Sequence, residues 1–206
     1  MHPAIIATAF ATVFVAELPD KTMLATVVLS ARFKRPLAVW TGAASALTVQ
    51  MVIAVVAGRL IGLLPDRAVS AAVAVLFGVG AVLLWRSAGE ADEEAAEAEA
   101  EAEAQAAAVS TGAPTPWWRI SATVFGVVFL AEWGDLTQLA TASLASRGDA
   151  LSVFVGATAA MITVAAIGVV AGRALLRVLP EHTLRKVAAV IFAVLSTVAL
   201  VAVVRG

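Results

Sequence analysis

Apolar residues run along this chain in long, nearly uninterrupted stretches, and the polar positions collect between them. A helix that crosses the hydrocarbon core of a bilayer needs about 20 predominantly apolar residues. Six stretches reach this length, and prolines punctuate the gaps between them, as expected where helices end. The predicted membrane-spanning helices cover residues 4–30, 37–64, 68–86, 118–146, 150–179 and 184–204. The first of them lacks a preceding basic segment and is too long for a signal-peptide core, so we expect it to be retained.

The second half of the chain repeats the first at an offset of 115 residues. FVAELPDKTMLATVVL (14–29) and FLAEWGDLTQLATASL (129–144) agree at nine of sixteen positions, and VVAGR occurs once in each half. Each copy contains three predicted helices, an odd number, so the second copy should enter the membrane upside down. The sequence therefore predicts an all-α integral membrane protein built from two inverted three-helix repeats, residues 1–86 and 118–206.

Composition supports a membrane protein. The chain is 61% hydrophobic and only 14% charged, with a mean hydropathy of +0.95, whereas soluble domains carry about 25% charged residues. Eight of the fifteen acidic residues fall between positions 90 and 103, inside a low-complexity segment, residues 87–117, that we interpret as a solvated linker between the repeats. The absence of cysteine excludes disulfides and thiolate metal sites, and no basic tract suggests a nucleic-acid partner.

Lysine and arginine residues predict the orientation of the chain. Nine lie on the side of the membrane that holds the 31–36 loop, the linker and the 177–186 loop, and four lie on the other side. The excess of positive charge marks the cytoplasmic side. We therefore expect a cytoplasmic linker, both termini outside, and residence in a bacterial inner membrane.

Two acidic motifs interrupt the first and fourth apolar stretches. Glu17 and Asp20 belong to the first, and Glu132 and Asp135 belong to the second. A spacing of three residues places both carboxylates of a pair on one face of a helix. Each charged residue near the centre of a membrane helix costs about 2.5–3.5 kcal/mol, so such groups indicate a function.

The motifs also contain residues that break helices. Pro19 removes a backbone N–H and should kink the first motif helix, and Gly134 loosens the backbone at the matching position of the second. Broken helices near the membrane midplane expose backbone carbonyls, and such backbone is tolerated where it lines a cavity. Thr22, Thr137 and Gln138 add neutral oxygen atoms within one turn.

Carboxylates, hydroxyls and carbonyls are hard donors that suit Ca²⁺, Mg²⁺ or Mn²⁺. Zinc would prefer imidazole, but His2 and His182 are far from both motifs. Four carboxylates and Lys21 sum to a charge of −3, which a divalent cation reduces to −1. An empty site at −3 in a low dielectric is costly, so protons should replace the departing cation. Competition for the same oxygens would produce antiport, with Lys21 balancing part of the charge.

Three other interpretations of these residues are possible. The acids could form buried ion pairs such as Glu17 with Lys21, but position 136 is Leu, so the second pair has no basic neighbour in its own helix. The same architecture could export a small organic solute such as an amino acid, although four acids make a poor site for its carboxylate. Trp133–Asp135 (WGD) resembles the Gly-Asp of intramembrane aspartyl proteases, whose chemistry gives no reason for paired glutamates.

The motifs resemble those of the Gdt-type family of manganese and calcium–proton exchangers. That family carries Glu-x-Gly-Asp-(Lys/Arg)-(Thr/Ser) once in each of two inverted three-helix repeats, which an acidic loop joins. The resemblance implies a cation site made by Glu17, Asp20, Glu132 and Asp135, with hydroxyls from Thr22 and Thr137. The chain departs from the pattern where Pro19 replaces glycine and Leu136 replaces the basic residue.

The combined prediction is a secondary transporter, not an enzyme, with no cofactor beyond its transported ion. It would export a divalent cation, Mn²⁺ ahead of Ca²⁺, in exchange for protons, by alternating access between the repeats. We expect metal ligands at Glu17, Asp20, Glu132, Asp135, Thr22, Thr137 and Gln138, and the four acids would also carry the protons.

Overall fold

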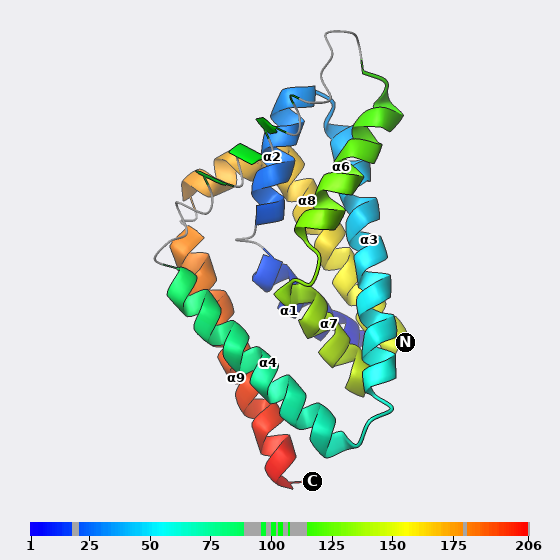
Figure 1. Ribbon diagram of the computed structural model, residues 1–206, viewed down its shortest axis with the longest axis vertical. Helices are drawn as coiled ribbons and strands as arrows, with labels where there is room; N and C mark the ends of the chain where they lie inside the picture. The colour runs from blue at the N-terminus through cyan, green and yellow to red at the C-terminus, as the bar shows by residue number, and fades with distance from the viewer. Residues whose placement is uncertain are drawn as a thin grey trace.

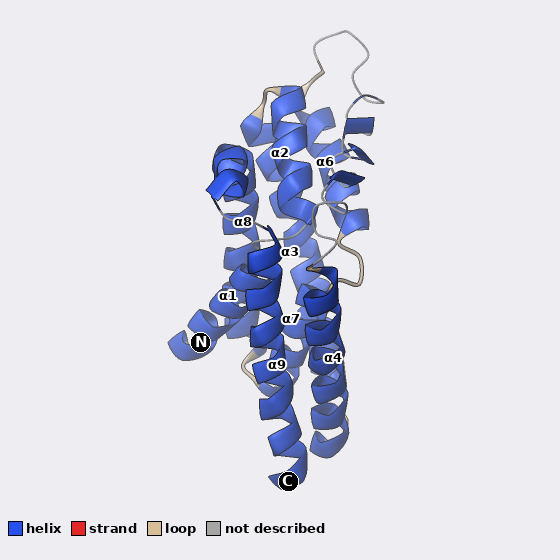
Figure 2. Cartoon of the chain, turned by 90° about the vertical axis from the view of Figure 1, so that its left-hand side faces the viewer, coloured by secondary structure: helices blue, strands red, loops and turns tan. Residues whose placement is uncertain are grey.

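The computed structural model describes the backbone of residues 1–17, 21–88, 96–97, 100–101, 103–104, 107, 115–178 and 181–205. Within these ranges, the side chains of residues 21–25, 66, 87, 171–178, 181–185, 188 and 205 are not described. The described part consists of helices and short connections and contains no strand (Figures 1 and 2). Its main elements are α1 (Pro3–Glu17), α2 (Lys21–Phe33), α3 (Pro36–Ile61), α4 (Asp66–Ser87), α6 (Trp117–Ala131), α7 (Leu136–Arg147), α8 (Ala150–Val178) and α9 (Glu181–Arg205).

Each of the six predicted stretches corresponds to one helix or to two consecutive helices. The two stretches that carry the acidic motifs correspond to the pairs α1–α2 and α6–α7. Among the described residues, α3, α4 and α8 are long and apolar enough to cross a membrane, and α6 with α7 forms a fourth candidate span that bends by 76°. The all-α class is therefore confirmed, and six crossings with inverted repeats stay a prediction.

The two halves of the chain pack on each other reciprocally. The helices α1 and α2 of the first half pack on α8 of the second, and α6 and α7 of the second half pack on α3 of the first. The remaining two helices, α4 and α9, pack mainly on each other and run side by side in both views (Figures 1 and 2). Each motif-bearing pair is thus supported by a long helix from the other half.

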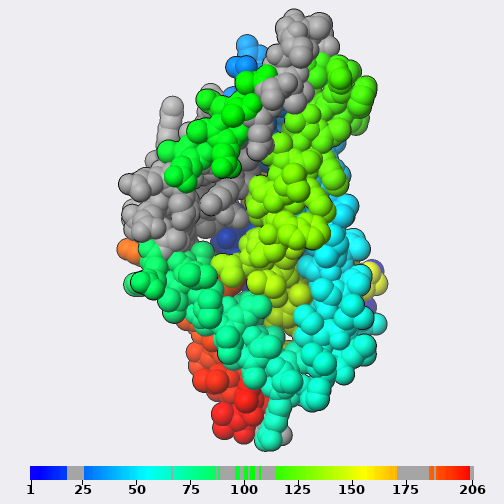
Figure 3. Space-filling model, viewed as in Figure 1, coloured from blue at the N-terminus to red at the C-terminus, as the bar shows by residue number. Residues whose placement is uncertain are grey.

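Helix α3 runs along both α6 and α7 and so spans the bend between them (Figure 1). In the space-filling view, cyan atoms of α3 lie beside the yellow-green atoms of α7 (Figure 3). Near its beginning, Thr41 and Ser121 share a hydrogen bond of 2.8 Å between their hydroxyls. Near its end, Gly58 lies against the backbone oxygen of Ala142, where a side chain would collide. Small residues of this kind allow membrane helices to approach closely. The long helix therefore fixes α6 and α7 relative to each other.

Aromatic and aliphatic contacts hold α4 to α9. Phe77 meets Phe192 edge to face, with ring centroids 5.2 Å apart. The hydroxyl of Ser196 donates a hydrogen bond of 2.8 Å to the carbonyl of Ala74. Leu136, at the start of α7, packs against the same apolar cluster. The α4–α9 pair therefore borders the second motif through apolar contacts.

Candidate functional site

The second motif forms a break between two helices. Helix α6 ends at Ala131, Glu132 caps it, and α7 begins at Leu136. Gly134 has a φ of +80°, in the left-handed region that residues with a Cβ rarely adopt. The sequence prediction that Gly134 loosens this helix is consistent with this conformation. In the first motif, α1 ends at Glu17 and α2 begins at Lys21.

Asp135 is held in place by the start of α7. It is the N-cap residue, and its Oδ1 accepts a hydrogen bond of 3.0 Å from the backbone N–H of Thr137. Such a cap satisfies one of the free N–H groups at the helix start, and the positive end of the helix dipole favours a carboxylate there. The cap occupies one carboxylate oxygen and orients the other.

The motifs of the two halves meet through their acids. Glu17 from the end of α1 joins Glu132 and Asp135, and one carboxylate oxygen of each lies within 4.8 Å of those of the other two. Glu17 is 1% exposed and Glu132 is 2% exposed, so both are taken out of solvent. The structure therefore brings together three of the four predicted acidic ligands, from residues more than 100 positions apart.

Thr137 lies between two of these acids. Its Oγ1 donates to Glu17 Oε2 at 2.9 Å, and it also contacts Asp135 Oδ2. A hydroxyl carries one proton and can donate only one hydrogen bond at a time. A cation or an added proton at this place would therefore allow both contacts of Thr137 to be favourable at the same time.

The electrostatics of this cluster favour a bound positive charge. Three carboxyl groups lie close together here, and two of them are almost fully buried. Removing a carboxylate from water is costly unless a partner compensates its charge. A divalent cation would reduce the charge of the three ionised carboxylates from −3 to −1. Protons on the carboxyl groups would do the same in its absence.

Two glutamines bond to the backbone at the end of α6. Gln138 donates through Nε2 to the carbonyl of Glu132 at 2.6 Å and accepts from the Gly134 N–H at 3.4 Å. Gln50 of α3 donates through Nε2 to the carbonyl of Phe129 at 2.9 Å. The last carbonyls of a helix have no partner within it, and these amides supply one. Gln138 thus joins the two ends of the break, a contact that its predicted role as ligand did not include.

The remaining predicted ligands fall outside what the structure describes. Pro19 and Asp20 lie outside the described residues, and the side chains of Lys21 and Thr22 are not described. The expected roles of these residues therefore stay predictions. Sequence reasoning did not single out Gln50, although it is the one amide side chain in a long apolar stretch and could have been found by that contrast.

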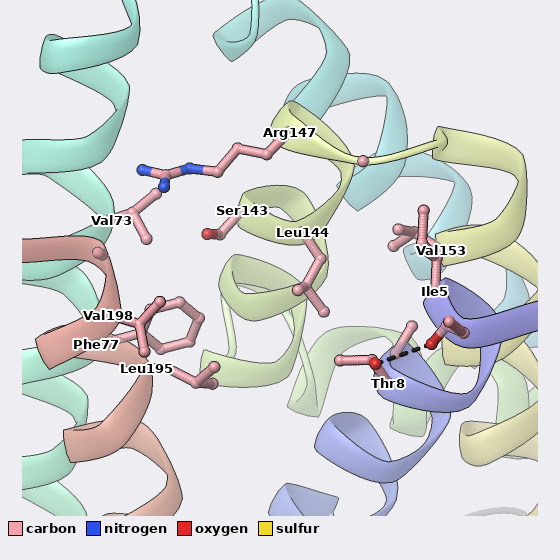
Figure 4. A pocket seen from close by; sticks show the side chains of 14 residues that line it. Ile5, Thr8, Val73, Phe77, Ser143, Leu144, Arg147, Val153, Leu195 and Val198 are labelled. Carbon is pink, nitrogen blue, oxygen red and sulfur yellow. Dashed lines mark hydrogen bonds between the residues drawn. The ribbon is translucent and has the colours of Figure 1, made fainter. Parts of the chain in front are cut away.

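A separate cavity of about 330 Å³ lies between the α4–α9 pair and the helices α1, α7 and α8 (Figure 4). Phe77 and Leu195 line one side of it, and Leu144 lines the other. Arg147 extends across it toward Val73. No carboxylate is found among the described residues that line it, and the guanidinium repels cations. The described groups that suit a cation are therefore those of the motif cluster.

Comparison with known proteins agrees with the duplicated motif. The family described as divalent cation/proton antiporter GDT1 matches residues 5–92 and 120–206, which leaves most of the linker unmatched. A GDT1-like protein of Synechocystis sp. is 30% identical over 86% of this chain and 87% of its own length. Protein PAM71 of Arabidopsis thaliana, a chloroplastic protein, is 32% identical over 96% of this chain and 57% of its own length.

A further relative, GDT1-like protein 3 of Arabidopsis thaliana, is 27% identical over 89% of the chain. The chain spans 66% of the length of this protein, so the plant relatives contain additional sequence. No solved structure matches the chain significantly.

Proposed function

Because this chain belongs to the GDT1 family of divalent cation/proton antiporters, we propose that it exports Mn²⁺, in preference to Ca²⁺, in exchange for protons. The transport site would consist of Glu17, Asp20, Glu132 and Asp135, with neutral oxygens from Thr22, Thr137 and Gln138. Lys21 would offset part of the negative charge of the empty site. The protein would act in a bacterial inner membrane with its linker in the cytoplasm.

The observation that carries this proposal is the meeting of Glu17 with Glu132 and Asp135, all within 4.8 Å of one another through a carboxylate oxygen. The cluster lies between the two halves of the chain and is assembled from both. Transporters with internal repeats bind their substrates at such an interface, where a relative movement of the halves changes access to the site.

Exchange of the cation for protons follows because both would bind to the same carboxylate oxygens. In the cation-loaded state, the carboxylates are ionised and bind the metal ion. When the cation leaves, protons restore the charge balance that the buried carboxylates need. The hydroxyl of Thr137 can then donate to the carboxylate of one acid, while the protonated carboxyl group of the other acid donates to the oxygen of that hydroxyl. The inward proton gradient across a bacterial membrane would therefore drive the cation outward.

The proposed preference for Mn²⁺ is supported by the way the carboxylate oxygens of the described cluster are already used. Ca²⁺ takes six to eight oxygen ligands at about 2.3–2.6 Å and often uses bidentate carboxylates. Asp135 already uses one oxygen as a helix cap, and Thr137 competes for one oxygen of Glu17. A cation that depends less on bidentate carboxylates than Ca²⁺ does fits the described cluster better. The purely oxygen donor set disfavours copper and zinc.

The test is transport by the full-length protein in liposomes. Proteoliposomes with an acidic lumen are given external Mn²⁺ or Ca²⁺, and metal uptake and lumenal pH are followed together. Glu17→Gln and Asp135→Asn remove one charge each, one from each half of the chain. Ser121→Ala, a hydroxyl deletion at the α3–α6 contact, serves as the matched control.

We expect metal entry coupled to proton exit in the wild type, with Mn²⁺ faster than Ca²⁺, and a loss of both fluxes in the two motif variants. The control should transport at the wild-type rate. Flux that is indifferent to both motif substitutions would contradict the assignment of the site. Equal or faster Ca²⁺ exchange would contradict the ion preference alone.

A further inference from the structure

Gln50 replaces a backbone hydrogen bond that the break in the second motif removes. In an unbroken helix, the carbonyl of Phe129 would accept from the N–H of Trp133. The N–H of Trp133 instead reaches the carbonyl of Leu130, at 3.4 Å. The Nε2 of Gln50, which is 1% exposed, donates to the Phe129 carbonyl at 2.9 Å. The amide of Gln50 is therefore held inside the protein against Phe129, a residue three positions before Glu132.

The oxygen of this amide has no hydrogen-bond donor among the described residues. Gln50 Oε1 is buried and accepts no hydrogen bond from the part of the chain that the structure describes. An unsatisfied buried acceptor destabilises the folded state, and native proteins leave few of them. Reversing the amide would place Oε1 against the Phe129 carbonyl, oxygen against oxygen, so the bond to Phe129 defines which atom is oxygen.

We propose that Gln50 Oε1 is a neutral ligand of the transported divalent cation, an inference that rests on the function proposed above. Amide oxygens are regular ligands of hard cations such as Ca²⁺. This oxygen would add to the coordination shell without adding negative charge to three closely spaced carboxylates. Its cost in the empty protein would be recovered when the cation binds.

The packing of α3 supports this placement. Met51, the next residue, contacts the hydroxyl of Thr141 on α7 through its sulfur at 3.6 Å, and Gln50 itself bonds to α6. Gln50 thus lies where α3 crosses the break that carries Glu132 and Asp135. The aligned positions in the second half, Val164 and Ala165, are apolar. The first half alone would therefore contribute this oxygen.

The experiment compares two substitutions at Gln50 in proteoliposomes that contain the full chain. Gln50→Met keeps the length of the side chain but replaces the hard oxygen by a soft thioether, which favours softer ions. Gln50→Glu keeps an oxygen but loses the donor to Phe129. Initial rates of Mn²⁺, Ca²⁺ and Cd²⁺ uptake are measured over a range of concentrations, and Ser121→Ala is the control on the same pair of helices.

We expect Gln50→Met to raise the apparent KM for Mn²⁺ and Ca²⁺ on the order of 10-fold or more, and to raise the rate of Cd²⁺ uptake relative to Mn²⁺. Gln50→Glu should keep the hard-ion preference and show stronger inhibition by acid, because it adds a group that protons can occupy. Ser121→Ala should match the wild type in KM and in ion preference.

The ligand assignment is overturned if Gln50→Met keeps the wild-type KM and ion ratios. It is also overturned if Gln50→Met and Gln50→Glu lose rate equally for all three ions, because both variants lack the bond to Phe129 and that result would assign Gln50 to helix positioning alone. Failure of the wild type to exchange any divalent ion for protons would instead contradict the function, and the two failures are therefore distinguishable.

Discussion

Thr137 donates a hydrogen bond to Glu17 across the interface between the two halves of the chain, with 2.9 Å between Oγ1 and Oε2. Thr137 lies in the first turn of α7, and Glu17 is the last residue of α1. Both side chains are buried. One contact therefore couples the end of one motif-bearing helix to the beginning of another. A change in the charge of Glu17 would alter the strength of this hydrogen bond to α7.

This contact predicts a difference between Thr137→Ser and Thr137→Val. Serine keeps the hydroxyl, whereas valine keeps the shape and leaves the carboxylate without this donor. We expect Thr137→Val to lower the rate of metal/proton exchange by about 10–100-fold, as is typical for groups that orient metal ligands, and Thr137→Ser to stay within about threefold. Initial uptake rates in proteoliposomes decide the question. Equal rates for the two variants would show that the hydroxyl is dispensable.

Gly134 and Gly126 allow the same chemical change to be made in two backbone conformations. A Cβ added at either position meets no atom within 4 Å, so steric collision plays no part. Gly134 has a φ of +80°, and Gly126 lies inside α6. We expect Gly134→Ala to destabilise the protein by about 1–3 kcal/mol through backbone strain, and Gly126→Ala to be neutral or stabilising by up to about 1 kcal/mol.

Thermal unfolding in detergent would measure this difference. The expected result is a lower midpoint for Gly134→Ala and an equal or higher midpoint for Gly126→Ala. Two equal midpoints would mean that the break can adopt a conformation open to any residue.

Gln138 offers a test between its predicted and its observed contacts. If Gln138 is a metal ligand, Gln138→Glu should strengthen cation binding, because a carboxylate binds a divalent cation more strongly than an amide does. If Gln138 instead links the two sides of the break, Gln138→Glu should weaken that link, because glutamate cannot donate to the carbonyl of Glu132. We expect lower stability, by about 1–3 kcal/mol for the buried carbonyl left without a donor, and slower exchange. A lower apparent KM for Mn²⁺ would favour the role as ligand instead.

The sequence predicts the helices and the break at Gly134 because each depends on local chemistry. Apolar length marks the helices, and Gly134 marks the break by its conformational freedom. The duplication of the motif also indicates that the acids of the two halves belong together. The contacts of Gln138 and Gln50 are not predictable in this way, because they depend on which carbonyls the break leaves without a partner. The backbone conformation at Gly134 determines which carbonyls these are.

The connection before α8 contains a group with a predictable dependence on pH. The hydroxyl and the backbone N–H of Ser152 both donate to Asp149 and hold the pKa of that carboxyl below its ordinary value of 3.8. A lowered pKa in the folded state contributes stability above 3.8 that is lost as the pH falls through the lower value. Ser152→Ala should therefore lower the unfolding midpoint at neutral pH, and its difference from the wild type should shrink in stronger acid. A difference that does not change with pH would contradict this.

Leu136 occupies the position where the resembling motif has a basic residue, and its surroundings explain why a basic residue does not suit this chain. Its Cδ2 would lie 3.2 Å from a Cβ built on Gly80, and Phe192 lies against the same glycine. Leu136→Arg would therefore place a guanidinium in the apolar cluster between α7 and the α4–α9 pair. We expect a loss of about 2.5–3.5 kcal/mol in stability, the cost of a charged residue within a membrane helix, while the volume-conserving Leu136→Met should cost less than about 1.5 kcal/mol. Unfolding midpoints in detergent measure both. An arginine variant as stable as the methionine variant would mean that its guanidinium reaches the carboxylates of the motif cluster, and exchange assays on that variant would then show an altered proton dependence.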